Sequence, residues 1–134
     1  MTVIFSCTLE QGKKRVDIID QPQNDGADAR YQSSAPGEAP TLEIDAAYSD
    51  LTTRTWVGSG QREWHGLTFR DGAYDYEIRV APALPEDGKG LTGSITISRS
   101  KRVIADMACD SGSIDGDLLA YIEKIQASKA RNID

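Results

Sequence analysis

The sequence is poor in the residue types that most often build catalytic and metal sites. It contains one histidine and two cysteines among 134 residues. A single histidine excludes a multi-histidine metal site, and it leaves His65 as the one imidazole that could serve a catalytic triad. The two cysteines form no CxxC pair and have no histidine beside them, so the pattern predicts neither a redox motif nor a zinc site. We therefore expect no metal and no cofactor.

Long hydrophobic runs and clusters of basic residues are also missing. No apolar stretch approaches the roughly 20 residues that a membrane-spanning helix needs. Acidic residues outnumber basic ones by 21 to 15, which gives a formal net charge of −6. The lysines and arginines form no stripe that could follow a phosphate backbone. We expect no membrane span and no binding of nucleic acid.

What the sequence does contain is a series of short segments in which apolar and polar residues alternate. Alternation with a period of two is typical of strands that bury one face. The clearest case follows the Asp71-Gly72 turn, where one face of residues 73–80 carries Tyr74, Tyr76, Ile78 and Val80. Similar segments, separated by turn residues, recur between residues 3 and 109. They predict about eight to nine antiparallel strands in a barrel or a sandwich.

The periodicity changes after residue 110 to that of a helix. We predict an amphipathic α-helix from about residue 115 to residue 130, with Asp115 as its N-cap. Its apolar stripe consists of Leu118, Leu119, Ile122 and Ile125. A lone helix of this length is not stable, so it should lie on the sheet or close an open end of a barrel. Residues 1–134 then form a single β-rich domain.

The two cysteines lie near the ends of the predicted β-region. Cys7 falls in the first strand-like segment and Cys109 at the end of the last. We expect a disulfide between them, and the alternative is two buried free thiols. A disulfide indicates an oxidising compartment, either the periplasm or the exterior. Met1 leads directly into a strand-like segment, so the protein is either cytosolic or an exported one in which Met1 replaces a signal peptide.

Candidate catalytic residues are few. His65 falls on the same face of a predicted strand as Leu67, which favours a structural role. The carboxylates of Asp75 and Glu77 alternate outward, as expected of a solvated face rather than of an acid/base pair. Gly58-Ser59-Gly60 lacks the GxSxG pattern of a nucleophile elbow. We expect no catalytic residues, and a hydrolase built around His65 is only the third hypothesis.

The segment from Trp56 to Trp64 has the composition of a recognition surface. It places two tryptophans and an arginine around a Gly-rich loop, and Trp and Arg are enriched at interface hot spots. The predicted partner-binding residues are Ser59, Gly60, Gln61, Arg62, Glu63 and Trp64. The alternative is that both tryptophans belong to the core.

Several segments resemble small exported bacterial proteins of unassigned function. They are Phe5-Ser6-Cys7, residues 12–18, Gly58-Ser59-Gly60-x-x-Glu63, residues 69–76 and residues 103–109. A more distant similarity is to the membrane-bound or periplasmic inhibitors of c-type lysozyme, small disulfide-tied β-barrels that insert a Ser-Gly loop into the lysozyme cleft. Ser59-Gly60 is the matching pair, whereas Glu63-Trp64 replaces a tyrosine of that family and the C-terminal helix is extra.

Two functions remain from these observations. The first is a periplasmic or secreted protein-binding module without enzymatic activity, an inhibitor or immunity-type protein directed at a cell-wall hydrolase or a secreted toxin. The acidic net charge suits a basic enzyme as the protein partner. The alternative is a carrier that holds a small ligand or a lipid in a barrel cavity.

Overall fold

The chain folds into two antiparallel β-sheets and a C-terminal helix. The computed structural model describes residues 2–21, 28–35, 37–56, 63–82 and 91–131. Within these residues there are ten strands, one 3-10 helix and one α-helix. The first sheet consists, in order, of β10 (Asp115–Gly116), β1 (Thr2–Leu9), β2 (Lys14–Asp20), β3 (Ala29–Ser34) and β4 (Leu42–Ala46).

The second sheet follows the order of the sequence. It consists of β5 (Thr52–Trp56), β6 (Trp64–Asp71), β7 (Tyr74–Pro82), β8 (Leu91–Arg99) and β9 (Arg102–Ala108). The 3-10 helix η1 (Tyr48–Asp50) lies between β4 and β5 in the chain. Each strand pairs antiparallel with its neighbours, as the alternating sequence pattern predicts.

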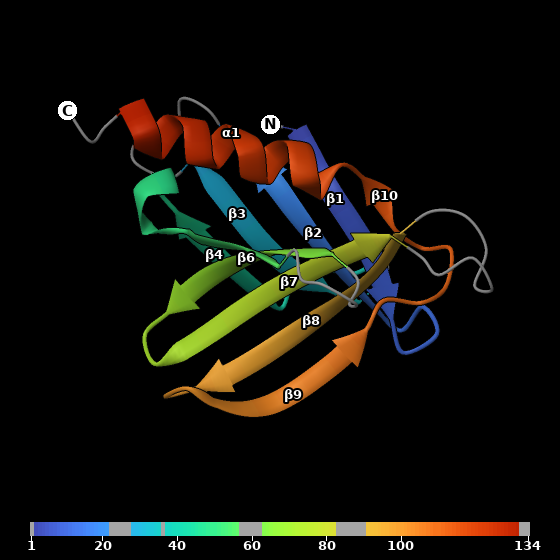
Figure 1. Cartoon of the computed structure of the whole chain (residues 1–134). Helices are drawn as coiled ribbons and strands as arrows, with labels where there is room; N and C mark the ends of the chain where they lie inside the picture. Colours follow the sequence, from blue (N-terminus) through green and yellow to red (C-terminus); the bar gives the residue numbers. More distant parts are fainter. Residues whose placement is uncertain (1, 22–27, 36, 57–62, 83–90, 132–134) are drawn as a thin grey trace.

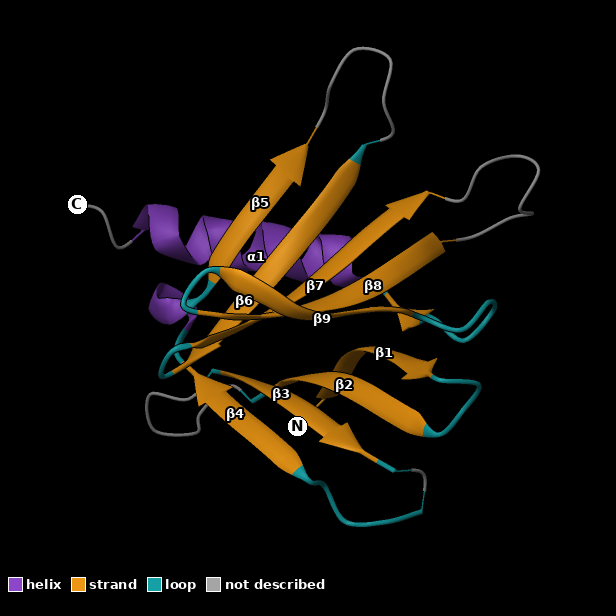
Figure 2. Ribbon diagram, turned by 90° about the horizontal axis from the view of Figure 1, so that it is seen from below, coloured by secondary structure: helices purple, strands orange, loops and turns teal. Residues whose placement is uncertain are grey.

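The two sheets form a sandwich and do not close into a barrel. Figure 2 shows them as separate layers, and among the described residues no strand of one sheet pairs with a strand of the other. The space between them is filled by the inward side chains of both sheets, among them Phe5, Ile18, Tyr31, Phe69 and Ile78. Of the two predicted architectures, the sandwich is the one that forms. The strand count is slightly higher than predicted because β10 has two residues, too few to show a period.

The C-terminal helix α1 spans Leu118–Arg131 and begins later than predicted. Asp117 caps it, since its Oδ1 accepts a hydrogen bond from the backbone N of Ala120 at 3.0 Å. Asp115, the predicted cap, lies instead in β10 and pairs with Ser6. Leu119, predicted to belong to the apolar stripe, is 37 % exposed, and Tyr121 is buried in addition to the other predicted residues.

Helix α1 covers one end of the sandwich, where it contacts β1, β6 and η1 (Figure 1). The buried carboxylate of Asp20, at the end of β2, accepts hydrogen bonds from Tyr48, from Tyr121 at 3.1 Å and from Lys124 at 2.8 Å. Burial opposes ionisation of Asp20, but these donors outweigh it and hold the pKa of the carboxyl below its usual range. Asp20 thus connects β2, η1 and α1 through one ionised group.

The predicted disulfide between Cys7 and Cys109 is present, with 5.7 Å between the two Cα atoms. It joins β1 of the first sheet to the residue after β9 of the second. The next residue, Asp110, extends this link, because its carboxylate accepts hydrogen bonds from the Thr8 hydroxyl at 2.7 Å and from the backbone N of Gln11 at 2.9 Å. In the described part of the chain, no helix combines the length and the apolar character that crossing a membrane requires.

The close approach of β10 to β1 depends on Gly116. Its φ is +102°, and a Cβ atom there would overlap the carbonyl oxygen of Ile4. We expect Gly116→Ala to lower the free energy of unfolding by about 2–3 kcal/mol, because it adds backbone strain and separates β10 from β1.

Gly72→Ala is the matched control for this prediction. Gly72 also has a positive φ of +62°, but open space surrounds the position of its missing Cβ. This variant should lose only about 1 kcal/mol, the ordinary cost of a left-handed alanine. Urea denaturation of both variants measures the difference, and equal losses would show that the contact with Ile4 is not what requires glycine.

Candidate functional site

The outer face of the second sheet carries a cluster of charged and aromatic side chains. Because side chains alternate along a strand, Glu77 and Arg79 lie opposite the inward residues of β7. Arg54 of β5 pairs in register with Gly66 of β6, and Gly66 pairs in turn with Arg79. We call Arg54, Trp64, Glu77 and Arg79 the Trp64 cluster.

Glu77 organises this cluster. Its carboxylate accepts hydrogen bonds from Nε and Nη2 of Arg54, both at 2.9 Å, and from Nε of Arg79 at 2.8 Å. The two guanidinium groups cover Glu77, which is 7 % exposed although it lies on the solvent side of the sheet. A carboxylate held by two arginines in this way keeps both of them in fixed positions.

Both arginines lie against the ring of Trp64. The Cζ atom of Arg79 is 4.3 Å from the ring centroid, and that of Arg54 is 5.4 Å from it. Gly66 leaves the space for this arrangement, because a Cβ there would lie 3.1 Å from Oε2 of Glu77 and 3.3 Å from Cζ3 of Trp64. Cation–π contacts of this kind contribute about 0.5–1 kcal/mol at exposed sites.

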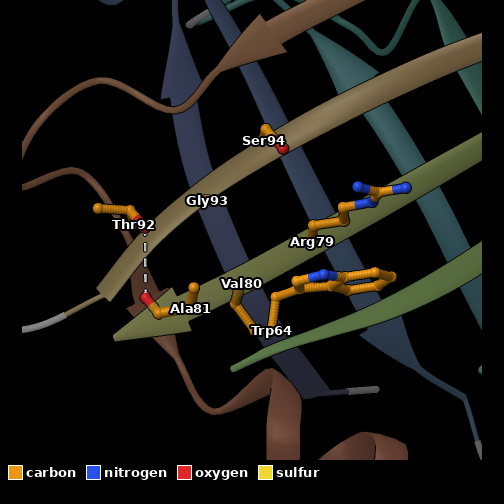
Figure 3. A pocket seen from close by; sticks show the side chains of 7 residues that line it. All are labelled: Trp64, Arg79, Val80, Ala81, Thr92, Gly93 and Ser94. Atoms are coloured by element: carbon orange, nitrogen blue, oxygen red, sulfur yellow. Dashed lines mark hydrogen bonds between the residues drawn. The ribbon is translucent and has the colours of Figure 1, made fainter. Parts of the chain in front are cut away.

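A shallow hollow of about 350 Å³ lies beside Trp64 and Arg79 (Figure 3). Its far side is formed by Ala81 of β7 and by Thr92 and Ser94 of β8, and the Thr92 hydroxyl donates to the carbonyl oxygen of Ala81 at 3.3 Å. The hollow is open to solvent along the sheet. It therefore offers a surface that another molecule can contact.

A second hollow of about 330 Å³ lies on the same face, with Arg54 and Glu77 in its lining. Threonine and serine hydroxyls surround it, together with Arg70, which donates to Asp75 at 2.9 Å. Together the two hollows are lined by four basic side chains and two acidic ones: Arg54, Arg70, Arg79, Lys101, Asp75 and Glu77. The face is thus locally cationic on a chain whose net charge is −6.

The predicted binding residues fall partly on this face. Ser59, Gly60, Gln61 and Arg62 lie outside the described residues. Glu63 is exposed directly before β6, and Trp64, at the first position of β6, is partly exposed and lines the first hollow. For Trp64 the alternative of a core residue is wrong, because its ring lies on the outer face of the sheet.

The sequence pattern alone did not indicate that Glu77 holds Arg54 and Arg79 in place. Its outward direction agrees with the prediction, but it is buried beneath two arginines and is not part of a solvated surface. The signal that could have found it is the outward pair Glu77-x-Arg79 opposite a glycine, which leaves room for a large neighbour.

His65 points the opposite way from Trp64, into the sandwich, as predicted. It is 8 % exposed, and its Nδ1 lies 3.2 Å from the hydroxyl oxygen of Thr55. Its Nε2 has no hydrogen-bond partner within the described residues, and the nearest carboxylate oxygen recorded there is that of Glu63 at 3.7 Å. Among the side chains that the structure describes, no group of three or more could hold a metal ion.

The fold is a disulfide-linked β-sandwich. The outer face of its second sheet carries tryptophan, arginine and hydroxyl groups. No known protein family, characterised protein or solved structure matches the chain in comparison. The resemblance to exported bacterial proteins and to lysozyme inhibitors therefore stays a prediction.

Proposed function

We propose that the chain is a protein-binding module without enzymatic activity, and that the outer face of the second sheet, centred on the Trp64 cluster, is its docking surface. The observation that carries this proposal is the fixed position of two arginines over a partly exposed tryptophan. Trp and Arg are the residue types most enriched at interface hot spots.

Pre-organisation gives this surface an advantage in binding. A long side chain that becomes ordered in an interface loses about 0.5–1.5 kcal/mol of conformational free energy. Arg54 and Arg79 are already ordered by their hydrogen bonds to Glu77. Each guanidinium has five N–H donors, so both retain donors for a carboxylate or a carbonyl group of a partner.

In this proposal the partner is a cell-wall hydrolase or a secreted toxin that the chain inhibits in the periplasm or outside the cell. The disulfide supports such a compartment, because disulfides persist where the environment is oxidising. The net charge of −6 favours long-range attraction to a partner of positive net charge, and the locally cationic docking face requires carboxylate or carbonyl groups of that partner at the contact. The Trp64 cluster then makes the contacts at short range.

The test compares the protein with two variants. We expect the double variant Trp64→Ala, Arg79→Ala to bind the partner at least about 30-fold more weakly, the loss typical of a hot spot. Arg30→Ala is the matched control, since Arg30 is also bound to carboxylates, Glu43 and Asp45, but on the other sheet.

Candidate partners are captured from cell-envelope extract with each form of the protein as bait, purified, and titrated by isothermal calorimetry. Inhibition of the purified partner's hydrolytic or toxic activity is measured in parallel. A specific partner that binds the double variant as tightly as the unchanged protein would refute the assignment of this face.

A further inference from the structure

A cleft of about 350 Å³ opens between the two sheets at the end of the sandwich that α1 leaves uncovered. The cleft and the helix lie at opposite ends of strand β2. The strand begins beside the cleft at Lys14, and its last residue, Asp20, accepts a hydrogen bond from Lys124 of α1. The cleft shares no residue with the Trp64 cluster or with its two hollows. It is therefore a separate site from the docking surface proposed above.

The interior of this cleft is apolar. Leu9 and Val16, each 1 % exposed, form its wall on the first sheet. The opposite wall consists of Ile97 and Met107 of the second sheet, which pack against the core and are only partly buried. Small-molecule sites typically measure about 300–1,000 Å³ and are lined mainly by apolar and aromatic side chains with a few polar groups. The cleft fits the lower end of that range.

Two tyrosines supply polar groups inside the cleft. Tyr31, which is 2 % exposed, and Tyr76 lie with their ring centroids 5.2 Å apart. Both tyrosines line the cleft. Burial and the neighbouring Tyr76 raise the pKa of Tyr31, so its hydroxyl remains a donor.

Two lysines stand at the entrance. Lys13 and Lys14 line the cleft and are exposed. In the part of the chain that the structure describes, neither lysine forms an ion pair, whereas Lys124 pairs with Asp20. Two lysines without an ion pair among the described residues, at the mouth of an apolar cleft, favour a ligand with an apolar body and an anionic end.

We propose that this cleft binds a single-chain amphiphile with an anionic head group, its alkyl chain between the sheets and its head beside Lys13 and Lys14. Leu9, Val16, Ile97 and Met107 contact the alkyl chain, and Lys13 and Lys14 attract the anionic oxygens of the head group. The ligand then lies between the two sheets of the sandwich. It does not lie in the cavity of a closed barrel, which was the alternative architecture predicted from the sequence.

The experiment is isothermal calorimetry with laurate below its micellar concentration. We expect saturable binding of one laurate, and at least tenfold weaker binding of dodecyltrimethylammonium, which has the same chain and the opposite charge. The double variant Lys13→Glu, Lys14→Glu should bind laurate at least tenfold more weakly and bind dodecyltrimethylammonium more tightly than the unchanged protein does. Lys101→Glu, an exposed lysine of the outer hollow, is the control and should change laurate binding less than twofold.

Two further measurements complete the test. Substituting 1-lauroyl-lysophosphatidylglycerol for laurate distinguishes a lipid from a free fatty acid as the source of the head group. In NMR spectra, laurate should shift the methyl signals of Met107 and Ile97 and leave the indole N–H signal of Trp64 unchanged. Absence of saturable binding, equal binding of the cationic amphiphile, or shifts confined to Trp64 would each overturn the proposal.

Discussion

Replacement of both Cys7 and Cys109 by alanine should lower the free energy of unfolding by about 4–5 kcal/mol, the effect expected for a disulfide that closes a loop of roughly 100 residues. The two cysteines are 102 positions apart in the sequence. The bond also joins the two sheets, between which no backbone pairing occurs among the described strands. Since domains are typically stable by about 5–15 kcal/mol, this single bond represents a large share of the total.

Urea denaturation monitored by circular dichroism measures the effect. Reduction of the unchanged protein is the control, because it breaks the same bond without altering side-chain volume. Reduced protein and the double variant should unfold at similar urea concentrations, both well below the oxidised protein. If the oxidised and reduced forms unfold together, the disulfide does not restrain the unfolded chain as described.

Asp20→Ala should lower the free energy of unfolding by about 2 kcal/mol at pH 7, because it leaves the buried hydroxyl of Tyr121 without its acceptor and removes the hydrogen bond to Lys124, whose side chain is half exposed. Both of these hydrogen bonds connect α1 to the first sheet. Asp45→Ala is the matched control. Its carboxylate also has a lowered pKa and bonds Arg30, but it is exposed, so the expected loss is below about 1 kcal/mol.

The contribution of Asp20 also depends on pH. The pKa of its carboxyl is lower in the folded chain than in the unfolded one, where it is about 3.9. The stabilisation is therefore fully present above about pH 5 and is lost as the pH falls through the lower, folded value. Denaturation between pH 2 and pH 7 should show a smaller acid-induced loss in Asp20→Asn than in the unchanged protein. Parallel curves for the two proteins would contradict this account of Asp20.

The strands were predictable because their signal is local. Alternation along Tyr74, Tyr76, Ile78 and Val80 identifies β7 without any knowledge of its neighbours. The predicted start of α1 is wrong for the opposite reason. Asp115 and Asp117 are both suitable caps, and the choice depends on the pairing of Asp115 with Ser6, more than a hundred residues away. Whether sheets close into a barrel likewise depends on which edge strands pair, and the sequence pattern of a single strand does not indicate its partner.

The candidate site was predictable at one residue and not at the others. Trp64 stands out by its type, since tryptophan is rare in this chain. Glu77 has the sequence context of an ordinary solvated carboxylate, because its burial depends on Arg54, which lies 23 positions earlier. Convergence of arginines from two strands, β5 and β7, on one carboxylate is a property of the sheet register, and the alternation pattern does not contain it.

NMR titration with the captured partner shows whether the outer face of the second sheet binds it. The indole N–H signal of Trp64 and the Nε–H signals of Arg54 and Arg79 should shift or broaden as the partner is added. The Nε–H signal of Arg30, on the first sheet, should stay unchanged. Perturbation of Arg30 with no change at Trp64, Arg54 and Arg79 would show that the partner binds the other sheet instead.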